Sequence, residues 1–412
     1  MRTVFTVAAL IGSLVLGALT GYLFVVRLLP SAPLLPDHPL YRTFGIVKPK
    51  VIGFLPYFLM GKATHDYHSS LTDLTYFGLV LQPDGSVQKL VSPHEQEPGY
   101  TVLTGGKWRA FAKPYTDAGV GTSLLVHTGD EDVIAMLVTN PASSAATLVS
   151  SVLPAMKTYG FRDLNLDIES FRTASDSARA NFTTFLATVA SAMHTAGYTV
   201  TVELSPSAFT KSYLTDPVAV GRYADYVLIM GYDYHYTGSY VAGPVAPIRG
   251  APSVRENDVA TTIASATAAI PPQKIILGVP LYGYQWETLT ATPSSGVIPG
   301  SGVAASAARV ASLSATCTTC TVTRDPVADE RIITKPDPST GSTYQFFLPD
   351  ETALAAKVAL ASEYHLAGVA LWALGYEDAT ILSPLSTYRS AARITPSFTL
   401  PVTVTNVLSR LR

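Results

Sequence analysis

The stretch RDLNLDIE, residues 162–169, alternates polar and apolar side chains from Asp163 to its end. Alternate side chains of a β-strand face opposite sides. One face of this stretch is aliphatic: Leu164, Leu166 and Ile168. The other face carries an amide and carboxyls: Asp163, Asn165, Asp167 and Glu169. The pattern therefore predicts a strand with two chemically different sides.

Short apolar runs recur along the chain from Lys50 onward, separated by longer stretches with helical spacing. Eight runs are predicted strands: Val51–Leu55, Leu74–Leu81, Thr122–His127, Leu164–Glu169, Val200–Leu204, Tyr226–Met230, Ile275–Pro280 and Gly368–Ala373. The intervening predicted helices include Ala142–Tyr159, Ser175–Ala196, Val259–Ala269 and Glu351–Tyr364. Eight strand–helix units predict a (β/α)8 TIM barrel of the α/β class. An open doubly wound sheet is the alternative, although no G-x-G-x-x-G follows the first strand.

In a closed barrel, the aliphatic face of residues 162–169 must meet the outer helices, so the polar face points into the lumen. Burying carboxyls without partners costs on the order of several kcal/mol each. Proteins accept such a cost mainly at functional sites. An exposed edge strand with a solvated face is the alternative, but a closed barrel has no edge. The stretch therefore indicates an active site.

Glu169 is the last residue of this strand, and active sites of TIM barrels lie at the C-terminal ends of the strands. Asp167 precedes it on the same face, at most about 7 Å away along the strand. Two carboxyls this close raise the proton affinity of one of them. We therefore expect Glu169 to keep a proton near neutral pH and to act as a general acid.

The interval between the seventh and eighth strands is too long for one crossover helix. Residues 284–348 contain Ser-, Gly- and Thr-rich stretches and short β-like runs, which predict a small α+β insertion. The same interval holds the chain's two cysteines, Cys317 and Cys320. A lone C-x-x-C is compatible with a tight disulfide, a redox pair or half of a zinc site. We favour a local disulfide in an oxidising compartment, because neither a second cysteine pair nor a histidine cluster lies nearby.

The N-terminal residues differ from the rest of the chain. Val4 to Val26 is a run of 23 residues without a charge, long enough for a transmembrane helix. We expect residues 1–28 to be an uncleaved membrane anchor, with a cleaved signal peptide as the alternative. Residues 29–48 contain four prolines and predict an extended linker. The catalytic domain is then predicted at 49–395, followed by a C-terminal tail at 396–412.

Composition narrows the possible partners. The formal net charge of −2 argues against nucleic acid as a partner, since such binding requires a basic surface. The 22 tyrosines suit a carbohydrate, whose ring offers an apolar face for stacking and hydroxyls for hydrogen bonds. Core and surface packing would explain the same tyrosines equally well.

Residues 160–169, GFRDLNLDIE, resemble the fourth-strand signature of glycoside hydrolase family 18, the chitinase-like enzymes. That signature reads D-G-x-D-x-D-x-E in chitinases. In the bacterial branch related to spore-cortex-lytic enzymes it reads D-G-x-N-x-D-x-E. Asn165 stands at the position of the Asn in this second form, so the chain resembles this branch more closely than the chitinases. Three further segments resemble the family's sixth, seventh and eighth strands: IMGYDYH at 229–235, LGVPLYGYQW at 277–286 and GVALWALGY at 368–376.

The resemblance implies a retaining, substrate-assisted mechanism, an exception to the two-carboxylate scheme. It implies that Glu169 is the acid/base, that Asp167 orients the substrate's 2-acetamido group and that Tyr232 hydrogen-bonds the acetamide oxygen. It further implies cleft positions that bind substrate: Asn165, Asp233, Tyr282 and Trp372. No cofactor or metal is implied.

Some positions depart from the signature or stay open. Arg162 and Asp163 stand where the family has Asp and Gly, so the first Asp of the motif is either absent or replaced by Asp163. Glu203 on the fifth strand faces either the cleft or a buried arginine.

These observations predict a glycoside hydrolase acting on β-1,4-linked, N-acetylglucosamine-containing polysaccharide, either peptidoglycan-like or chitin-like. A catalytically inactive, chitinase-like glycan-binding protein is the alternative. We expect it to lie outside the cytoplasm, held at the membrane by its N-terminal helix, or else to be secreted.

Overall fold

The computed structural model describes residues 46–250, 257–310, 317–378, 380–391 and 393–394. Contacts divide the chain into two units, Met1–Lys48 with Ala392–Arg412, and Pro49–Ala391. In the first unit, the described strands β1 (Ile46–Val47) and β17 (Arg393–Ile394) pair antiparallel. The predicted membrane segment 1–28, the tail 396–412 and nearly all of the linker 29–48 lie outside the described residues.

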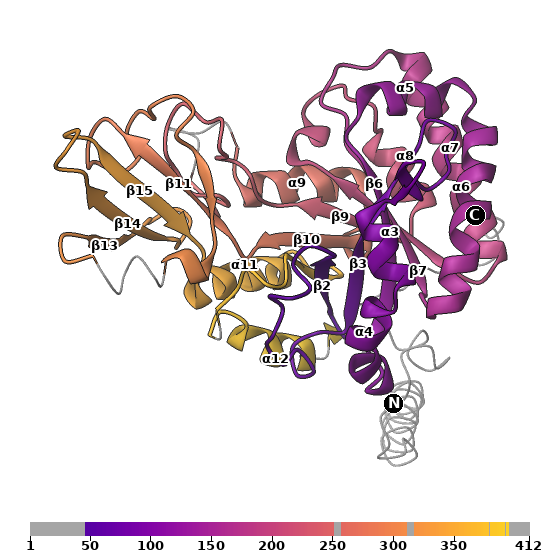
Figure 1. Ribbon diagram of the computed structural model, residues 1–412, viewed down its shortest axis with the longest axis horizontal. Helices are drawn as coiled ribbons and strands as arrows, with labels where there is room; N and C mark the ends of the chain where they lie inside the picture. The colour runs from indigo at the N-terminus through magenta and orange to yellow at the C-terminus, as the bar shows by residue number, and fades with distance from the viewer. Residues whose placement is uncertain (1–45, 251–256, 311–316, 379, 392, 395–412) are drawn as a thin grey trace, which may run out of the picture. The chain divides into compact units, whose positions relative to one another are not determined.

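A closed barrel of eight parallel strands forms the centre of the second unit (Figure 1). In chain order these strands are β2 (Lys50–Pro56), β3 (Asp73–Val80), β6 (Gly121–Thr128), β7 (Asp163–Ile168), β8 (Thr199–Leu204), β9 (Tyr226–Met230), β10 (Ile275–Pro280) and β16 (Gly368–Trp372). Each strand pairs with the next strand of this series, and β16 pairs with β2. The predicted (β/α)8 barrel is confirmed, with all eight strands where the sequence placed them.

Helices cover the outside of the barrel (Figure 1). The α-helices are α3 (Pro98–Thr104), α4 (Lys107–Asp117), α5 (Glu131–Thr139), α6 (Pro141–Tyr159), α7 (Asp176–Thr195), α8 (Pro217–Tyr223), α9 (Val259–Ala269), α11 (Glu351–Glu363) and α12 (Ser383–Ser390). Two short 3-10 helices, η1 (Pro206–Phe209) and η2 (Pro272–Lys274), lie in the connections. Strands β4 (Leu90–Ser92) and β5 (Glu95–Gln96) form a small hairpin. Taken singly, none of the helices described has the length and apolar character needed to cross a membrane. Only the sharply bent pair α5–α6 reaches these limits.

The alternation of β7 decides what lies on each side of the barrel wall. Leu164, Leu166 and Ile168 belong to the large core packed between the strands and the helices. Inside the lumen, a smaller apolar cluster contains Phe54, Leu125 and other inward side chains. The polar face of β7 therefore points into the lumen, as the sequence predicted.

Local signals fix where β7 begins and ends. Gly160 ends α6 with φ 74°, a left-handed conformation that suits glycine, and β7 starts three residues later. After the strand, Ser175 caps α7 by accepting a hydrogen bond from the backbone N–H of Ala178. The backbone N–H of Glu169 still donates to Thr128 O (3.0 Å), so Glu169 continues the line of the strand.

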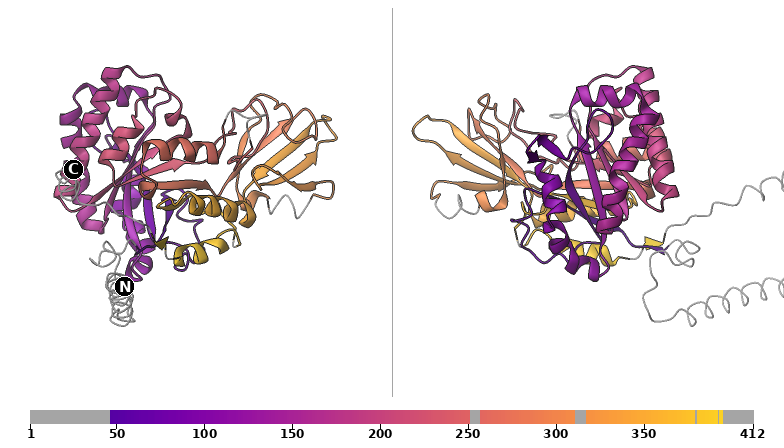
Figure 2. Two further views of the ribbon diagram at one scale, coloured as in Figure 1. Left: turned by 180° about the vertical axis from the view of Figure 1, so that it is seen from behind. Right: turned by 45° about the vertical axis from the view of Figure 1, so that its right-hand side comes forward.

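A five-stranded antiparallel sheet is inserted between β10 and β16 (Figure 2). Its order is β12 (Val303–Ala305), β11 (Gly283–Thr288), β15 (Thr343–Leu348), β14 (Arg331–Pro336) and β13 (Thr321–Arg324). Residues 307–310 are helical, and Cys317 and Cys320 form a disulfide. Both the insertion and the local disulfide agree with the prediction from sequence.

The insertion is joined to the barrel by a buried charge pair. The carboxylate of Glu330 accepts hydrogen bonds from the backbone N–H groups of Val245 and Ala246, both at 2.9 Å. Its Oε1 lies 3.6 Å from Nζ of Lys357 on α11, and both side chains are almost fully buried. Trp286 packs in the core of the insertion rather than in the barrel lumen.

Candidate active site

Glu169 lies at the C-terminal end of β7 and opens into a surface pocket. The residues around this pocket come from the C-terminal ends of β7 and β8 and from the segments that follow them: Ile168, Ser170, Phe171, Glu203, Leu204, Ser205, Ala208, Tyr213 and Thr215. Glu169 is half-buried, and its neighbour Ser170 donates a hydrogen bond to Glu131. A carboxyl in this position is partly shielded from bulk water and keeps some exposure at the surface.

Behind Glu169, polar side chains fill the upper lumen. Asn165, Asp167 and Glu203 are 1%, 7% and 3% exposed. The Asn165 side chain hydrogen-bonds to the Glu203 carboxyl. Among the residues that the structure describes, no hydrogen-bond partner reaches three buried oxygens here: Asn165 Oδ1, Asp167 Oδ1 and Glu203 Oε1. Buried polar atoms without partners are uncommon and mark this region as specialised.

The pKa of every carboxyl in this group is raised above its usual value. Burial raises the pKa of Asp167 well above its usual range, and the charge of Glu169 adds to the rise. Burial also raises the pKa of Glu203, with further contributions from Asp167 and Glu169. For Glu169, burial is again the larger cause of the raised pKa, followed by the charge of Asp233. The pKa of Glu169 is raised, in the direction that the sequence predicted. The causes are burial and the charge of Asp233, whereas the prediction had named Asp167.

Two tyrosines hold Asp233 at the rim. Asp233 follows β9 with φ 59°, a left-handed conformation that few residues other than glycine adopt. The hydroxyls of Tyr282 and Tyr284 both donate to its Oδ1, Tyr284 at 2.9 Å. Tyr282 is only 6% exposed. The buried Tyr282 hydroxyl is therefore bonded to Asp233, and its role in substrate binding stays a prediction.

Tyr232 lies between the rim and the upper lumen. It packs against the lumen cluster, and its ring meets that of Tyr282 edge-on at 6.2 Å between centroids. Burial raises the pKa of the Tyr232 hydroxyl well above its usual value, and the nearby carboxyls Glu203, Asp167 and Glu169 add to the rise. The hydroxyl therefore stays protonated and able to donate a hydrogen bond.

Trp372, the last residue of β16, lies half-buried among aromatic rings. Its ring centroid is 4.9 Å from that of Phe77 and 5.8 Å from that of Phe54. Phe77 in turn stacks on His127 at 4.5 Å, and burial lowers the pKa of His127 to about 4. His127 is therefore a neutral ring at physiological pH, and these residues form an apolar support at the top of the lumen.

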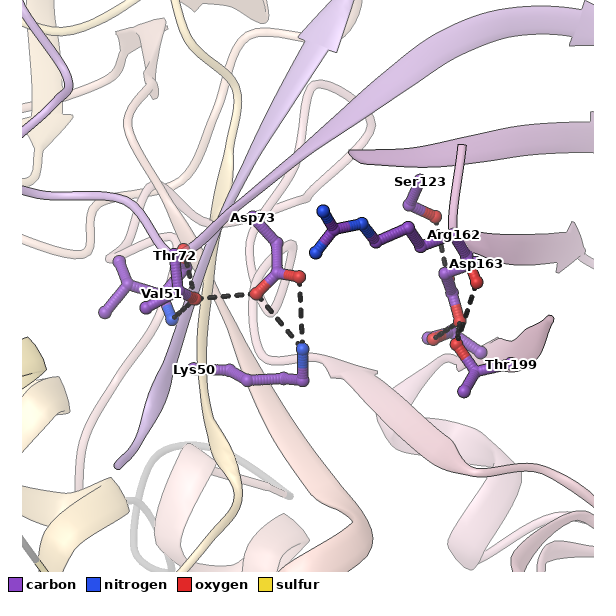
Figure 3. A network of polar contacts seen from close by, with 9 residues as sticks. Lys50, Val51, Thr72, Asp73, Ser123, Arg162, Asp163 and Thr199 are labelled. Atoms are coloured by element: carbon purple, nitrogen blue, oxygen red, sulfur yellow. Dashed lines mark hydrogen bonds and ion pairs between the residues drawn. The ribbon is translucent and has the colours of Figure 1, made fainter. Parts of the chain in front are cut away.

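Asp163, the first residue of β7, lies at the opposite end of the lumen, and Figure 3 shows its polar contacts. Its carboxyl accepts hydrogen bonds from Ser123 (2.7 Å), Thr199 (2.6 Å) and Thr201 (3.1 Å). At the same end, Lys50 Nζ lies 3.1 Å from both carboxylate oxygens of Asp73. Asp163 therefore bonds neighbouring strands together at the base of the barrel.

The sequence reasoning did not assign several residues that the structure brings to the site. Glu203 was left open, although Val202 and Leu204 on either side face the outer core, which turns Glu203 inward. Tyr284 could have been found because it alternates with Tyr282. Phe171 and Tyr213 meet edge-on at 6.2 Å between centroids beside Glu169. Within the part of the chain that the structure describes, no group of three His, Cys, Asp or Glu side chains is placed to hold a metal ion.

A TIM barrel with a half-buried carboxyl of raised pKa at the C-terminal end of a strand is the arrangement expected of a barrel hydrolase that uses acid catalysis. The profile of "Glycosyl hydrolases family 18" matches residues 126–377, and the chain belongs to this family.

Curated relatives share parts of this region. The "Putative sporulation-specific glycosylase YdhD" of Bacillus subtilis (strain 168) is 31% identical over 160 residues, covering 38% of this chain and 34% of that protein. The "Cortical fragment-lytic enzyme" of the same organism is 25% identical over 254 residues, covering 59% of this chain and 53% of that enzyme. The chain thus spans about a third to a half of the length of these relatives.

Solved structures share the fold. The spore cortex-lytic enzyme SleL of Bacillus cereus superposes with a TM-score of 0.64 at 21% identity, covering 85% of this chain and 76% of that one. A GH18 chitinase from Cycas revoluta in complex with (GlcNAc)3 gives a TM-score of 0.68 at 21% identity, covering 82% and 99%.

Proposed function

We propose that the protein hydrolyses a β-1,4-linked polysaccharide containing N-acetylglucosamine, by retaining, substrate-assisted catalysis. One observation carries the proposal: the Glu169 carboxyl lines a small surface pocket at the C-terminal end of β7, two residues beyond Asp167 on the same inward face. Family membership supports the reaction class, because family 18 comprises glycosyl hydrolases.

In the proposed reaction, Glu169, Asp167 and Tyr232 each act on a different group of the substrate. Glu169 gives its proton to the glycosidic oxygen as the bond to the anomeric carbon breaks. The acetamide oxygen of the substrate attacks the same carbon and forms an oxazolinium ion. Asp167 accepts a hydrogen bond from the acetamide N–H and balances the positive charge, while the Tyr232 hydroxyl donates to the acetamide oxygen. The Glu169 carboxylate then takes a proton from the water that opens the ion, and the anomeric configuration is retained.

A wall glycan of the peptidoglycan type is the preferred substrate in this proposal. The names of the cortical fragment-lytic enzyme and of SleL describe enzymes that act on the spore cortex. In addition, Asn165 stands where the signature of that branch has Asn. Chitin is the second candidate, supported by the likeness to a chitinase that holds (GlcNAc)3. In both polymers the cleaved sugar carries the N-acetyl group that the mechanism requires.

The test is to incubate the full chain with peptidoglycan and with chitin oligomers and to identify the products by mass spectrometry. Glu169→Gln removes the proton donor while keeping the shape, so its rate should fall by about 10²–10⁴-fold. Glu131→Gln is the matched control, since Glu131 lies near the same rim and its contacts are a hydrogen bond from Ser170 and a long ion pair with the exposed Arg172. De-N-acetylated chitin should resist cleavage. Wild-type protein that binds these glycans and cleaves none would favour the alternative, an inactive glycan-binding protein.

The proposal also includes a place outside the cytoplasm, with residues 1–28 as a membrane anchor. The charge-free run Val4–Val26 and the disulfide Cys317–Cys320 support it. Fractionation of cells that produce the full chain should recover it with the membranes, and alkaline carbonate should not extract it. Recovery of a shortened chain in the medium would support the alternative of secretion.

A further inference from the structure

Glu203 stands beside Asp167 in the upper lumen. Strands β7 and β8 are in parallel register up to the pair Leu166 and Val202, and Asp167 and Glu203 are the next residues of each strand. Both side chains face inward, since their neighbours along each strand belong to the outer core. Neighbouring strands are about 4.8 Å apart, so the two side chains lie on adjoining strands close enough for the charge of Asp167 to act on Glu203.

The hydrogen bonds around this pair leave a specific gap. Asn165 donates to the Glu203 carboxyl. Glu203 Oε1 and Asp167 Oδ1 are both buried, and no donor among the described residues reaches either oxygen. Two ionised carboxyls have only acceptors to offer each other, whereas one proton between them satisfies both atoms.

The groups that act on Glu203 supply no positive charge. From β7 they are Asn165, Asp167 and Glu169, and the Tyr232 hydroxyl acts from the end of β9. Burial and these carboxyls raise the pKa of Glu203 well above its usual range. A third negative charge in this volume would repel the other two and gain no partner.

We propose that Glu203 is a positioning residue that holds a proton and donates a hydrogen bond to Asp167. The inference rests on the proposed function, in which Asp167 must be ionised to orient the acetamide. A neutral donor beside Asp167 stabilises that charge. Glu203 thus allows Asp167 to be ionised while Glu169, two residues further along β7, keeps its proton.

The pH profile of kcat/KM separates this role from a general structural one. Loss of a hydrogen bond to a charged group raises the pKa of Asp167, so the acidic limb should move to higher pH. In Glu203→Leu we expect a shift of about one to two pH units. In Glu203→Gln the amide still donates to Asp167, and the limb should stay near that of the wild type. Thr201→Val, on the same face of β8 but bonded to Asp163, is the control and should not move it.

Two outcomes would overturn the proposal. A Glu203→Gln variant as impaired as Glu203→Leu would show that the site needs a charge rather than a neutral donor. A Glu203→Leu variant with an unmoved acidic limb would show that Asp167 does not depend on this partner.

A stability measurement tests whether Glu203 holds a proton without any need for activity. If the wild-type protein cleaves no glycan, that result therefore overturns the proposed function but leaves this measurement valid. Because the folded-state pKa of Glu203 is raised, the folded protein holds more protons than the unfolded chain above the usual pKa of 4.5. Wild-type stability should therefore fall relative to Glu203→Gln as the pH rises from about 4.5. The variant should melt higher at pH 8, with the difference vanishing near pH 4. A variant that melts lower at pH 8 would contradict a proton-holding Glu203.

Discussion

At the N-terminal end of the barrel lumen, hydroxyl groups from three residues donate hydrogen bonds to the carboxyl of Asp163. At the C-terminal end, Asp167 and Glu203 each keep one buried oxygen that no donor among the described residues reaches. Both groups lie inside the same barrel, and burial raises the pKa of Asp163 as well as of the upper carboxyls. Asp163 is half-buried whereas Asp167 and Glu203 are buried, but the larger difference between the two ends lies in their hydrogen bonds.

The difference separates a structural use of a buried carboxyl from a functional one. Fully bonded polar groups hold neighbouring strands together and need nothing further. Oxygens left without donors are costly to the folded protein, but they can accept hydrogen bonds from a ligand. Substitutions at the lower end should therefore change stability, and substitutions at the upper end should change activity.

Asp167→Asn should give the largest effect. The variant loses the charge that balances the oxazolinium ion, so kcat should fall by about 10²–10³-fold. Its stability should instead rise at neutral pH. The folded-state pKa of Asp167 is raised, so the wild-type protein loses stability as the pH rises above the usual value of 3.8, and the amide removes that loss. Steady-state kinetics and melting curves at pH 4 and pH 7 measure both effects. An Asp167→Asn variant that stays active and is less stable at pH 7 would show that Asp167 has a structural role, like Asp163 at the other end of the lumen.

Asp163→Ala should give the opposite result. The change leaves the hydroxyls of Ser123, Thr199 and Thr201 without their acceptor, which should lower the free energy of unfolding by about 2–4 kcal/mol. Because Asp163 lies at the far end of the lumen, kcat of the folded enzyme should be unchanged. Denaturant unfolding gives the first quantity and kinetics below the melting temperature give the second. Loss of kcat with full stability would assign Asp163 to the catalytic machinery.

The sequence predicted the backbone better than the contacts. The alternation of residues 162–169 predicted which side chains face the lumen, and the eight apolar runs predicted the barrel, because both depend on periodicity alone. It could not predict that Asp163 meets Ser123 and Thr201, since such contacts depend on the register of β6, β7 and β8. The left-handed backbone of Asp233 depends in the same way on its tertiary partners Tyr282 and Tyr284.

Thr201→Val should give the smallest effect and tests whether the lower network depends on any single bond. Thr201 Oγ1 makes the longest of the hydrogen bonds to Asp163, at 3.1 Å, and Thr199 donates to the same oxygen at 2.6 Å. Valine keeps the β-branched shape and removes the hydroxyl, while Asp163 keeps two donors. The free energy of unfolding should therefore fall by only about 0.5–1.5 kcal/mol, with kcat and its pH profile unchanged. A loss equal to that of Asp163→Ala would mean that this one hydroxyl holds the lower network together, and the contrast between a shared set of bonds below and unpaired oxygens above would no longer hold.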